Sequence, residues 1–164
     1  MQVIDWQLIV NKHGPVVWQT AYRLVGNAAD SADCFQETFV SALEVSRRQR
    51  VRNFSALLVR LATARAIDRL RQRSRQPRLS TDAANVAAVA SNNPGPFQEV
   101  QRRELAEKLR EALCQLPLQE AEVFCLRYLS DMSYRQIAKE LGIKTNTAGV
   151  MLHRARTKLR ELIE

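Results

Sequence analysis

The sequence contains no long apolar run. Its 164 residues include no window of about 18 uncharged apolar residues, so we expect no membrane-spanning helix and no membrane insertion. The residues after Met1 lack both a basic and an apolar stretch, so no secretory signal is expected. Glycine and proline are scarce, with five of each, which favours long helices over a turn-rich β fold. These absences predict an all-α protein.

Patterns that carry catalysis or bind metals are also absent. The three cysteines (Cys34, Cys114 and Cys125) form no CxxC pair and have apolar neighbours, which indicates buried, reduced thiols in a cytoplasmic protein. No GxxxxGK[ST], GxSxG or HExxH motif occurs, and His13 and His153 are isolated. We therefore expect no catalytic residues, no enzymatic activity, no cofactor, no metal site and no small-molecule substrate.

Positive charge is abundant but unevenly distributed. The net charge is +8. Residues 47–78 hold eleven arginines against one acid, and residues 133–164 hold seven basic residues against three acids. A basic block can be a solvated helix surface. Charges this dense repel one another unless a polyanion binds, so the two blocks indicate two contacts on one nucleic acid.

The composition also suggests how the chain is divided. Residues 76–98 are mostly small and polar and include Pro94 and Pro96, which are expected to block a helix. We interpret this segment as a flexible linker. The expected architecture is two small helical domains, residues 1–75 and residues 99–164.

Local signals predict where several helices begin and end. The Gly14–Pro15 pair is expected to stop the first helix. Asp30 has the features of an N-cap for the helix that carries Phe35 and Phe39. Asn53 or Ser55 is expected to cap the following helix.

The sharpest pattern lies between residues 133 and 162. Ser133 and Gln136 have the spacing of a capping box, and Gly142 is expected to end the short helix that they begin. A longer basic helix follows from about Thr145, which completes a helix-turn-helix pattern; an ordinary three-helix bundle with a charged surface is the alternative. The residues expected at base edges are Lys144, Thr145, Asn146, Thr147, Gly149 and Val150, and those suited to phosphates are His153, Arg154, Arg156, Lys158 and Arg160.

A second basic pattern lies on the preceding arginine-rich helix. Arg65, Arg69 and Arg73 are four residues apart and share one face, and Arg71 and Arg75 form a neighbouring row. A solvated face usually carries acids at a spacing of four, whereas this helix has a single acid. The pattern therefore favours phosphate binding.

Three stretches of the chain resemble, in the expected order, the extracytoplasmic-function group of bacterial sigma-70 factors. Residues 22–39, with the run Gln36-Glu37-Thr38-Phe39, resemble regions 2.1 and 2.2. Residues 54–75 resemble regions 2.3 and 2.4. Residues 113–159, with the run Leu152-His153-Arg154-Ala155-Arg156, resemble region 4.

The resemblance implies an alternative sigma factor that binds core RNA polymerase and directs promoter recognition, −10 melting and transcription initiation. Its expected partners are the polymerase β′ clamp helices and β flap, promoter DNA and an anti-sigma factor. The residues implied to bind core polymerase are Asp30, Asp33, Gln36, Glu37 and Phe39. From the residues alone, helix capping explains the acids in this group at least equally well.

The resemblance also implies two DNA-binding surfaces. The residues implied to engage the −10 element are Arg47, Arg48, Arg50, Arg52, Asn53, Arg60, Arg65, Arg69, Arg71, Arg73 and Arg75. Those implied to read the −35 element are Arg135, Lys144, Thr145, Asn146, Thr147, Gly149, Val150, His153, Arg154, Arg156 and Lys158.

Two departures from the family pattern affect the expected DNA contacts. Ala64 stands where many members carry asparagine. Residues 146–151 read Asn-Thr-Ala-Gly-Val-Met where members often carry Gly-Thr-Val-Lys-Ser-Arg. Two basic positions are thus lost, so base readout is expected to be sparser or to depend on DNA shape.

Two other functions compete with the sigma-factor interpretation. A free-standing helix-turn-helix regulator would bind a palindromic operator as a dimer, but would leave residues 36–39 and the arginine-rich helix unexplained. A pure interaction protein would use its basic helices to bind an acidic partner and would not bind DNA. The second basic block, the linker and the acidic helix favour the sigma factor.

Overall fold

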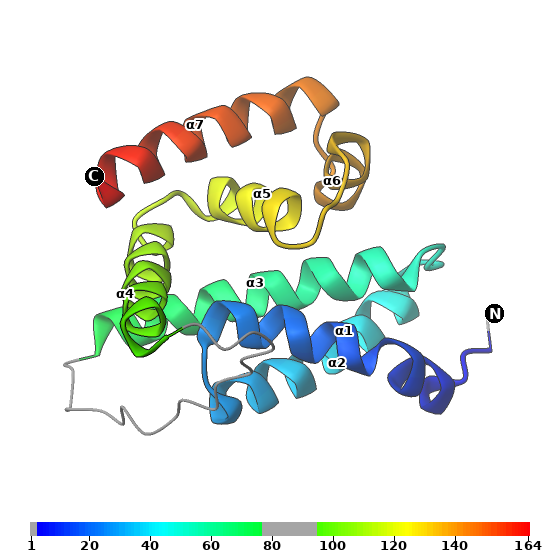
Figure 1. Cartoon of the computed structure of the whole chain (residues 1–164). Helices are drawn as coiled ribbons and strands as arrows, with labels where there is room; N and C mark the ends of the chain where they lie inside the picture. Colours follow the sequence, from blue (N-terminus) through cyan, green and yellow to red (C-terminus); the bar gives the residue numbers. More distant parts are fainter. Residues whose placement is uncertain (1–2, 77–94) are drawn as a thin grey trace.

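The structure is a computed structural model that describes residues 3–76 and 95–164 (Figure 1). Within these residues it contains seven helices and no strand, so the all-α prediction is confirmed. The helices are α1 (Trp6–Val25), α2 (Ala28–Arg48), α3 (Phe54–Arg75), α4 (Pro96–Leu113), α5 (Leu118–Tyr128), α6 (Tyr134–Leu141) and α7 (Thr145–Ile163). None of the helices in the described ranges has the length and apolar character needed to cross a bilayer.

The first helix does not stop at residues 14 and 15, so that prediction is wrong. α1 continues through Pro15 to Val25. A proline inside a helix costs about 3 kcal/mol, but the α1 side chains on both sides of it are packed. Trp6 and Ile9 lie against the core before the proline, and Val17 is fully buried after it. Packing along the whole helix therefore outweighs the local penalty.

The start of α2 also differs from the prediction. Asn27, not Asp30, is the N-cap, because its side-chain oxygen accepts a hydrogen bond of 2.8 Å from the Asp30 backbone N–H. The Asn27 amide also donates to the Asp30 carboxylate at 2.9 Å. Asn53 caps α3 as expected, through a 3.0 Å bond from the Ala56 N–H.

The first three helices enclose their own core. Its buried residues are Val17, Ala42, Val51, Leu57, Leu58, Leu61 and Ala62. Four aromatic side chains of this half extend the packing. Trp6 and Phe54 meet edge to face with ring centroids 5.9 Å apart, and Phe35 and Phe39 are tilted with centroids 5.0 Å apart. This core holds α2 and α3 side by side, so charged residues of the two helices lie close to one another.

The last four helices form the second half of the chain. α4 begins at Pro96, inside the range predicted to be linker. Pro96 occupies the first helical position, where its missing N–H has no partner to lose, so it starts a helix instead of blocking one. Residues 77–94, which make up most of the predicted linker, lie outside the described residues.

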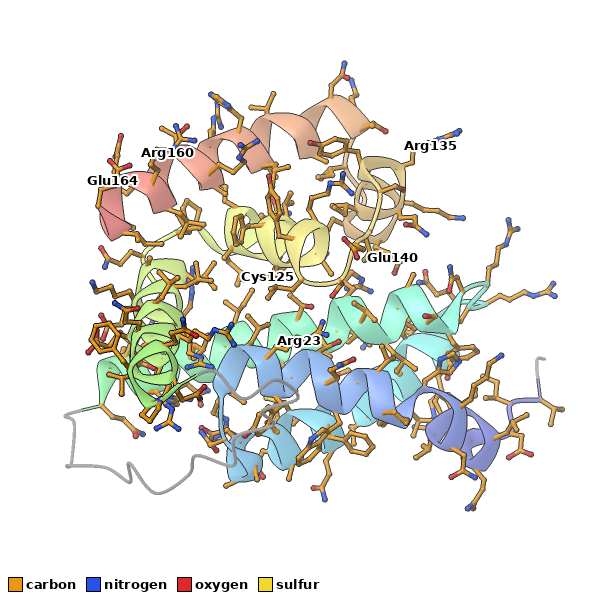
Figure 2. The ribbon with its side chains drawn as sticks, viewed as in Figure 1. Arg23, Cys125, Arg135, Glu140, Arg160 and Glu164 are labelled. Carbon is orange, nitrogen blue, oxygen red and sulfur yellow. The ribbon has the colours of Figure 1, made fainter. Side chains whose placement is uncertain are left out.

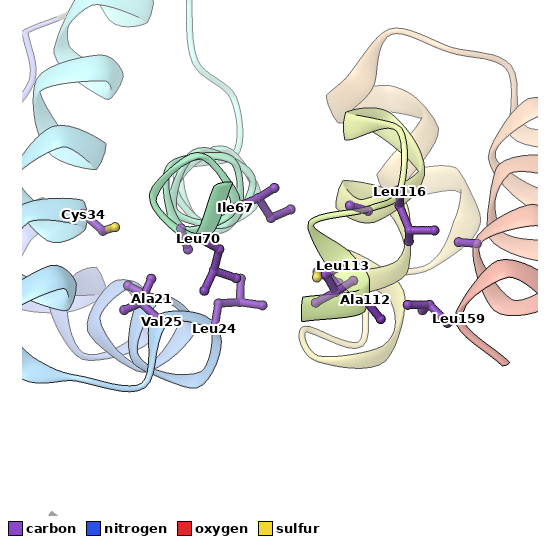
Figure 3. Packing of buried hydrophobic residues seen from close by; sticks show 14 residues of the cluster. Ala21, Leu24, Val25, Cys34, Ile67, Leu70, Ala112, Leu113, Leu116 and Leu159 are labelled. Carbon is purple, nitrogen blue, oxygen red and sulfur yellow. The ribbon is translucent and has the colours of Figure 1, made fainter. Parts of the chain in front are cut away.

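The two halves pack against each other through a shared apolar cluster (Figure 3). From α1 and α3 it includes Leu24, Ile67 and Leu70, and from the second half it includes Leu113 and Leu116. All five side chains are at most 4% exposed. The interdomain contact is thus a continuous core, a feature that the sequence patterns did not predict.

Candidate nucleic-acid interface

Helices α6 and α7 form the predicted helix-turn-helix. The Ser133 hydroxyl accepts a bond of 3.1 Å from the Gln136 N–H, and the Gln136 side chain accepts one of 3.0 Å from the Ser133 N–H. Gly142 ends α6 in the left-handed conformation, with φ at 66°. The capping box and the glycine C-cap are therefore confirmed.

The inner side of this unit is packed against α5. Ile137 and Leu152 are at most 2% exposed and share an apolar cluster with Val123 and Leu126 of α5. Because α7 packs against the rest of the protein on one side only, its opposite side is exposed to solvent. The exposed members of the predicted −35 set are Arg135, Lys144, Thr145, Asn146, Val150, His153, Arg154, Arg156 and Lys158, and Thr147 and Gly149 are half-buried. Figure 2 shows Arg135 at the outer edge of α6.

Gly149 and Gly142 offer a matched test of this local structure. A Cβ added at either position would meet nothing within 4 Å, so an alanine substitution changes only the backbone preference. Gly149→Ala is expected to stabilise α7 by about 1 kcal/mol, which raises the melting temperature by about 2–4 °C. Gly142→Ala is expected to lower it, because alanine is strained at positive φ. Thermal melts followed by circular dichroism check both signs, and shifts of the same sign would contradict this account of the turn.

The predicted basic loop joins the end of α2 to Asn53. Arg47 and Arg48 belong to the last turn of α2, and the remaining residues of the set, Arg50, Arg52 and Asn53, follow it; all five are exposed. A pocket of about 750 Å³ opens beside the loop and is lined by Ile4, Trp6, Leu43, Ser46, Arg47, Arg48, Gln49 and Arg50. Trp6 and three arginines therefore line one cavity, which sequence spacing could not predict because Trp6 lies more than forty residues before Arg47.

The arginine face of α3 meets acids from α2. Arg69 lies 3.0 Å from the Asp33 carboxylate, 3.6 Å from Glu37 and 3.9 Å from Asp30. Arg73 lies 3.4 Å from Asp30 and donates a 2.6 Å bond to the Val25 carbonyl. The acids that pair with these arginines come from the neighbouring helix α2 and not from α3 itself. These arginines therefore hold α2 against α3.

The other α3 arginines of the predicted −10 set point in several directions. Arg65 donates to the Ser41 hydroxyl at 3.0 Å. Arg60 lies 3.5 Å from the Glu140 carboxylate of α6, and Arg71 donates to the Leu116 carbonyl. Arg75, in the last turn, is exposed. The structure thus does not bring the whole set into one surface.

The predicted polymerase-binding set lies on α2. Asp33 and Glu37 are 56% and 50% exposed, whereas Asp30 is 22% exposed. Gln36 is exposed, and Phe39 is half-buried against the core. Sequence reasoning missed one neighbour, Val40, which is 57% exposed. Its helical spacing from Asp33, Gln36 and Glu37 would have placed it on the same face.

The three cysteine side chains are free thiols that are buried or half-buried. Burial raises the pKa of Cys34 to about 11 and that of Cys125 to about 12, and it also raises the pKa of Cys114. Since the thiolate is the reactive form, burial makes these thiols less reactive. Among residues 3–76 and 95–164, no group of three histidines, cysteines or carboxylates is arranged to hold a metal.

Comparison with known proteins assigns the two halves to one family. Residues 9–76 match the family described as Sigma-70 region 2, and residues 106–159 match Sigma-70, region 4. The chain is 31% identical over 155 residues to the ECF RNA polymerase sigma factor SigL of Mycobacterium tuberculosis, with 93% of this chain and 85% of the relative covered. The chain belongs to the extracytoplasmic-function sigma factors. It is an alternative sigma factor that directs transcription initiation, and the free-standing regulator is not favoured.

Further comparisons agree with this sigma-factor assignment. The ECF sigma factor SigE of Mycolicibacterium smegmatis is 30% identical over 159 residues, which cover 97% of this chain and 62% of that protein. The solved structure of CnrH in complex with the cytosolic domain of CnrY has a TM-score of 0.59 at 24% identity, and it covers 95% of this chain and 85% of that one. That likeness supports the fold. Sigma factors are not enzymes in the catalytic sense.

Proposed function

We propose that this sigma factor reads the −35 element with α7. The supporting observation is that the helix-turn-helix packs against α5 on its inner side only. The first turns of α7 are therefore exposed on the outer side. The width of the DNA major groove admits one helix with its N-terminal residues at base edges. Asn146 and Lys144 are exposed there. Arg154 and Lys158, about two and three turns beyond Asn146, are suited to the phosphates.

We propose that the −10 element is bound at the basic loop and its pocket. An unstacked base needs an apolar or aromatic surface for stacking, and the strand that carries it needs cations along its backbone. Trp6 supplies an aromatic surface, and Arg47, Arg48 and Arg50 supply the cations around the same cavity. This surface is better placed to bind the DNA strand than Arg69 and Arg73 are, because those two arginines already pair with acids of α2.

The proposed core-polymerase surface is the exposed face of α2. Asp33, Gln36, Glu37 and Val40 share this face, so it combines negative charge with a small apolar centre. The expected partners are the β′ clamp helices for α2 and the β flap for α5–α7. We further propose that an anti-sigma factor covers these surfaces in a cytoplasmic complex, and that residues 1–75 and 99–164 act as the two functional domains.

In vitro transcription tests this function. Core polymerase is incubated with a library of genomic fragments and either the wild-type protein or the Gln36→Ala/Val40→Ala variant. Discrete start sites are expected with the wild-type protein and at least a tenfold loss with the variant, because the substitutions remove both a polar and an apolar contact. Neither substituted side chain contributes to the core, so the fold should be unchanged.

The matched control carries the same two substitutions on another exposed helix. Val100→Ala/Gln101→Ala on α4 removes a valine that is 51% exposed and its exposed glutamine neighbour. Transcription with this control should equal that of the wild-type protein. Equal activity of the α2 variant and the wild-type protein would refute the α2 surface. Operator binding without polymerase-dependent start sites would refute the proposed mechanism as a whole.

A further inference from the structure

Helix α7 carries a large apolar side chain on its outer side. Val150 is 50% exposed, whereas Leu152 and Leu159, which pack α7 onto its neighbours, are 2% and 4% exposed. Val150 belongs to none of the three apolar clusters formed by the described residues. The fold therefore does not use this side chain for packing. A single exposed valine needs no explanation by itself, but the position of this one suggests a function.

Val150 lies in the middle of the side of α7 that is proposed to enter the major groove. Asn146 precedes it by four residues, and His153 and Arg154 follow it by three and four, so these side chains share one side of the helix. The buried residues of α7 face the opposite way. In Figure 1, α7 forms the upper edge of the molecule, with α4, α5 and α6 below it. A DNA groove that receives α7 would therefore meet Val150 directly.

The charge around Val150 indicates what kind of partner covers it. Residues 144–160 hold five lysines and arginines and no acid. A polyanion fits such a surface. An apolar protein surface placed on Val150 would instead remove water from the neighbouring arginines, which costs free energy. The charge therefore favours DNA over a protein as the partner of this side chain.

The chemistry of the major groove indicates which base a valine prefers. Thymine presents an apolar 5-methyl group there, whereas the other bases present hydrogen-bond donors and acceptors. The valine side chain forms no hydrogen bonds, so contact with those polar groups would remove their water without replacing it. Contact between the valine and the methyl group instead buries apolar surface, which is favourable. Val150 is therefore suited to thymine.

We propose that Val150 is a specificity-determining residue, which selects a thymine in the −35 element by contact with its 5-methyl group. The inference rests on the proposed function, because it takes α7 as the helix in the major groove. Asn146, which is suited to adenine, lies four residues before Val150, a rise of about 6 Å along the helix. Successive base pairs are about 3.4 Å apart, so the adenine should lie within about two base pairs of the thymine.

Uracil in place of thymine removes the methyl group and keeps the pairing with adenine. Each thymine of the −35 element is replaced in turn by uracil in the promoter fragment recovered by in vitro transcription. The affinity of the sigma–polymerase complex for each fragment is then measured. With the wild-type protein, one replacement is expected to lower the affinity about three- to fivefold, because burial of one methyl group is worth roughly that factor. The other replacements should have little effect.

A serine variant connects this effect to Val150. Val150→Ser removes the apolar surface, and serine and valine have similar helix propensities. The variant should bind the thymine and uracil promoters equally, with about the affinity that the wild-type protein has for the uracil promoter. The control Val100→Ser makes the same change on α4, at a valine that is 51% exposed, and should keep the wild-type discrimination. Far-UV circular dichroism verifies that both variants keep the wild-type helix content.

Several results would overturn the proposal. A −35 element without thymine, or one in which no uracil replacement affects the wild-type protein, excludes methyl recognition. A uracil effect that persists in Val150→Ser assigns the methyl group to another residue. An equal loss for both promoters in Val150→Ser would show that Val150 contacts a protein instead of the methyl group.

The proposed function is tested separately by the Arg154→Ala/Lys158→Ala variant. If this variant weakens promoter binding while uracil has no effect, α7 binds the −35 element and only the methyl contact fails. If this variant binds the promoter as the wild-type protein does, the −35 role of α7 fails, and the inference about Val150 fails with it.

Discussion

Alanine at both Arg154 and Lys158 is expected to weaken binding of the sigma–polymerase complex to a −35 promoter about ten- to a hundredfold at roughly physiological salt. Both side chains are exposed on α7 and four residues apart, so they share one face. Each phosphate contact releases counterions, so the loss of two contacts should also reduce the slope of log affinity against log salt by about 2. Binding measured across a salt series gives both quantities.

Two further variants separate phosphate contacts from base reading. Arg102→Ala/Lys108→Ala on α4 removes the same charge from exposed positions and should leave affinity and slope nearly unchanged. Asn146→Ala should reduce the preference for the correct base at one position by about 1–3 kcal/mol and leave the salt slope intact. If the α4 control lost as much affinity as the α7 variant, general charge and not the recognition helix would explain the binding.

Alanine at Leu126 is expected to destabilise the protein by about 2–5 kcal/mol. Leu126 is fully buried in the cluster that joins α5 to α6, α7 and Val59 of α3, so its truncation leaves a cavity that the surrounding helices cannot fill. A loss of this size is a large share of a typical folding free energy of about 5–15 kcal/mol. Urea denaturation followed by circular dichroism measures the loss.

The control for this variant is the same substitution at a surface position. Leu105 on α4 is 57% exposed, so Leu105→Ala should change stability by no more than about 0.5 kcal/mol. Equal urea midpoints for Leu126→Ala and Leu105→Ala would show that the cluster around Leu126 does not contribute to stability as the structure indicates.

Much of the local structure was predictable because it depends on residues close together in the sequence. The capping box at Ser133, the turn at Gly142 and the cap at Asn53 follow from hydrogen bonds that span three or four residues. The helix-turn-helix and the exposed start of α7 follow from the same signals and from apolar spacing. The resemblance to the sigma-factor family also depends on short runs of residues that are close together in the sequence.

One error arose where distant residues decide the outcome, and another in the choice between two neighbouring capping residues. Pro15 was expected to end a helix, yet α1 continues because packing against α2 and α3 on both sides of the proline offsets its cost. Asp30 was expected to cap α2, but Asn27 takes that position, which leaves the Asp30 carboxylate for Arg73 and Arg69. Tertiary packing decided the first case, whereas the Asn27 cap is itself a local bond to the Asp30 N–H.

The sequence by itself determined the all-α class, the two helical halves, the helix-turn-helix and the sigma-factor family, since apolar periodicity and helix caps act over a few residues. Only the tertiary structure decided what the α3 arginines contact and how the halves meet. Their partners, from Asp33 on α2 to Glu140 on α6, are 36 and 80 residues distant from Arg69 and Arg60. Contacts at such separations depend on how whole helices pack against each other. The spacing of residues within one short segment therefore does not predict them.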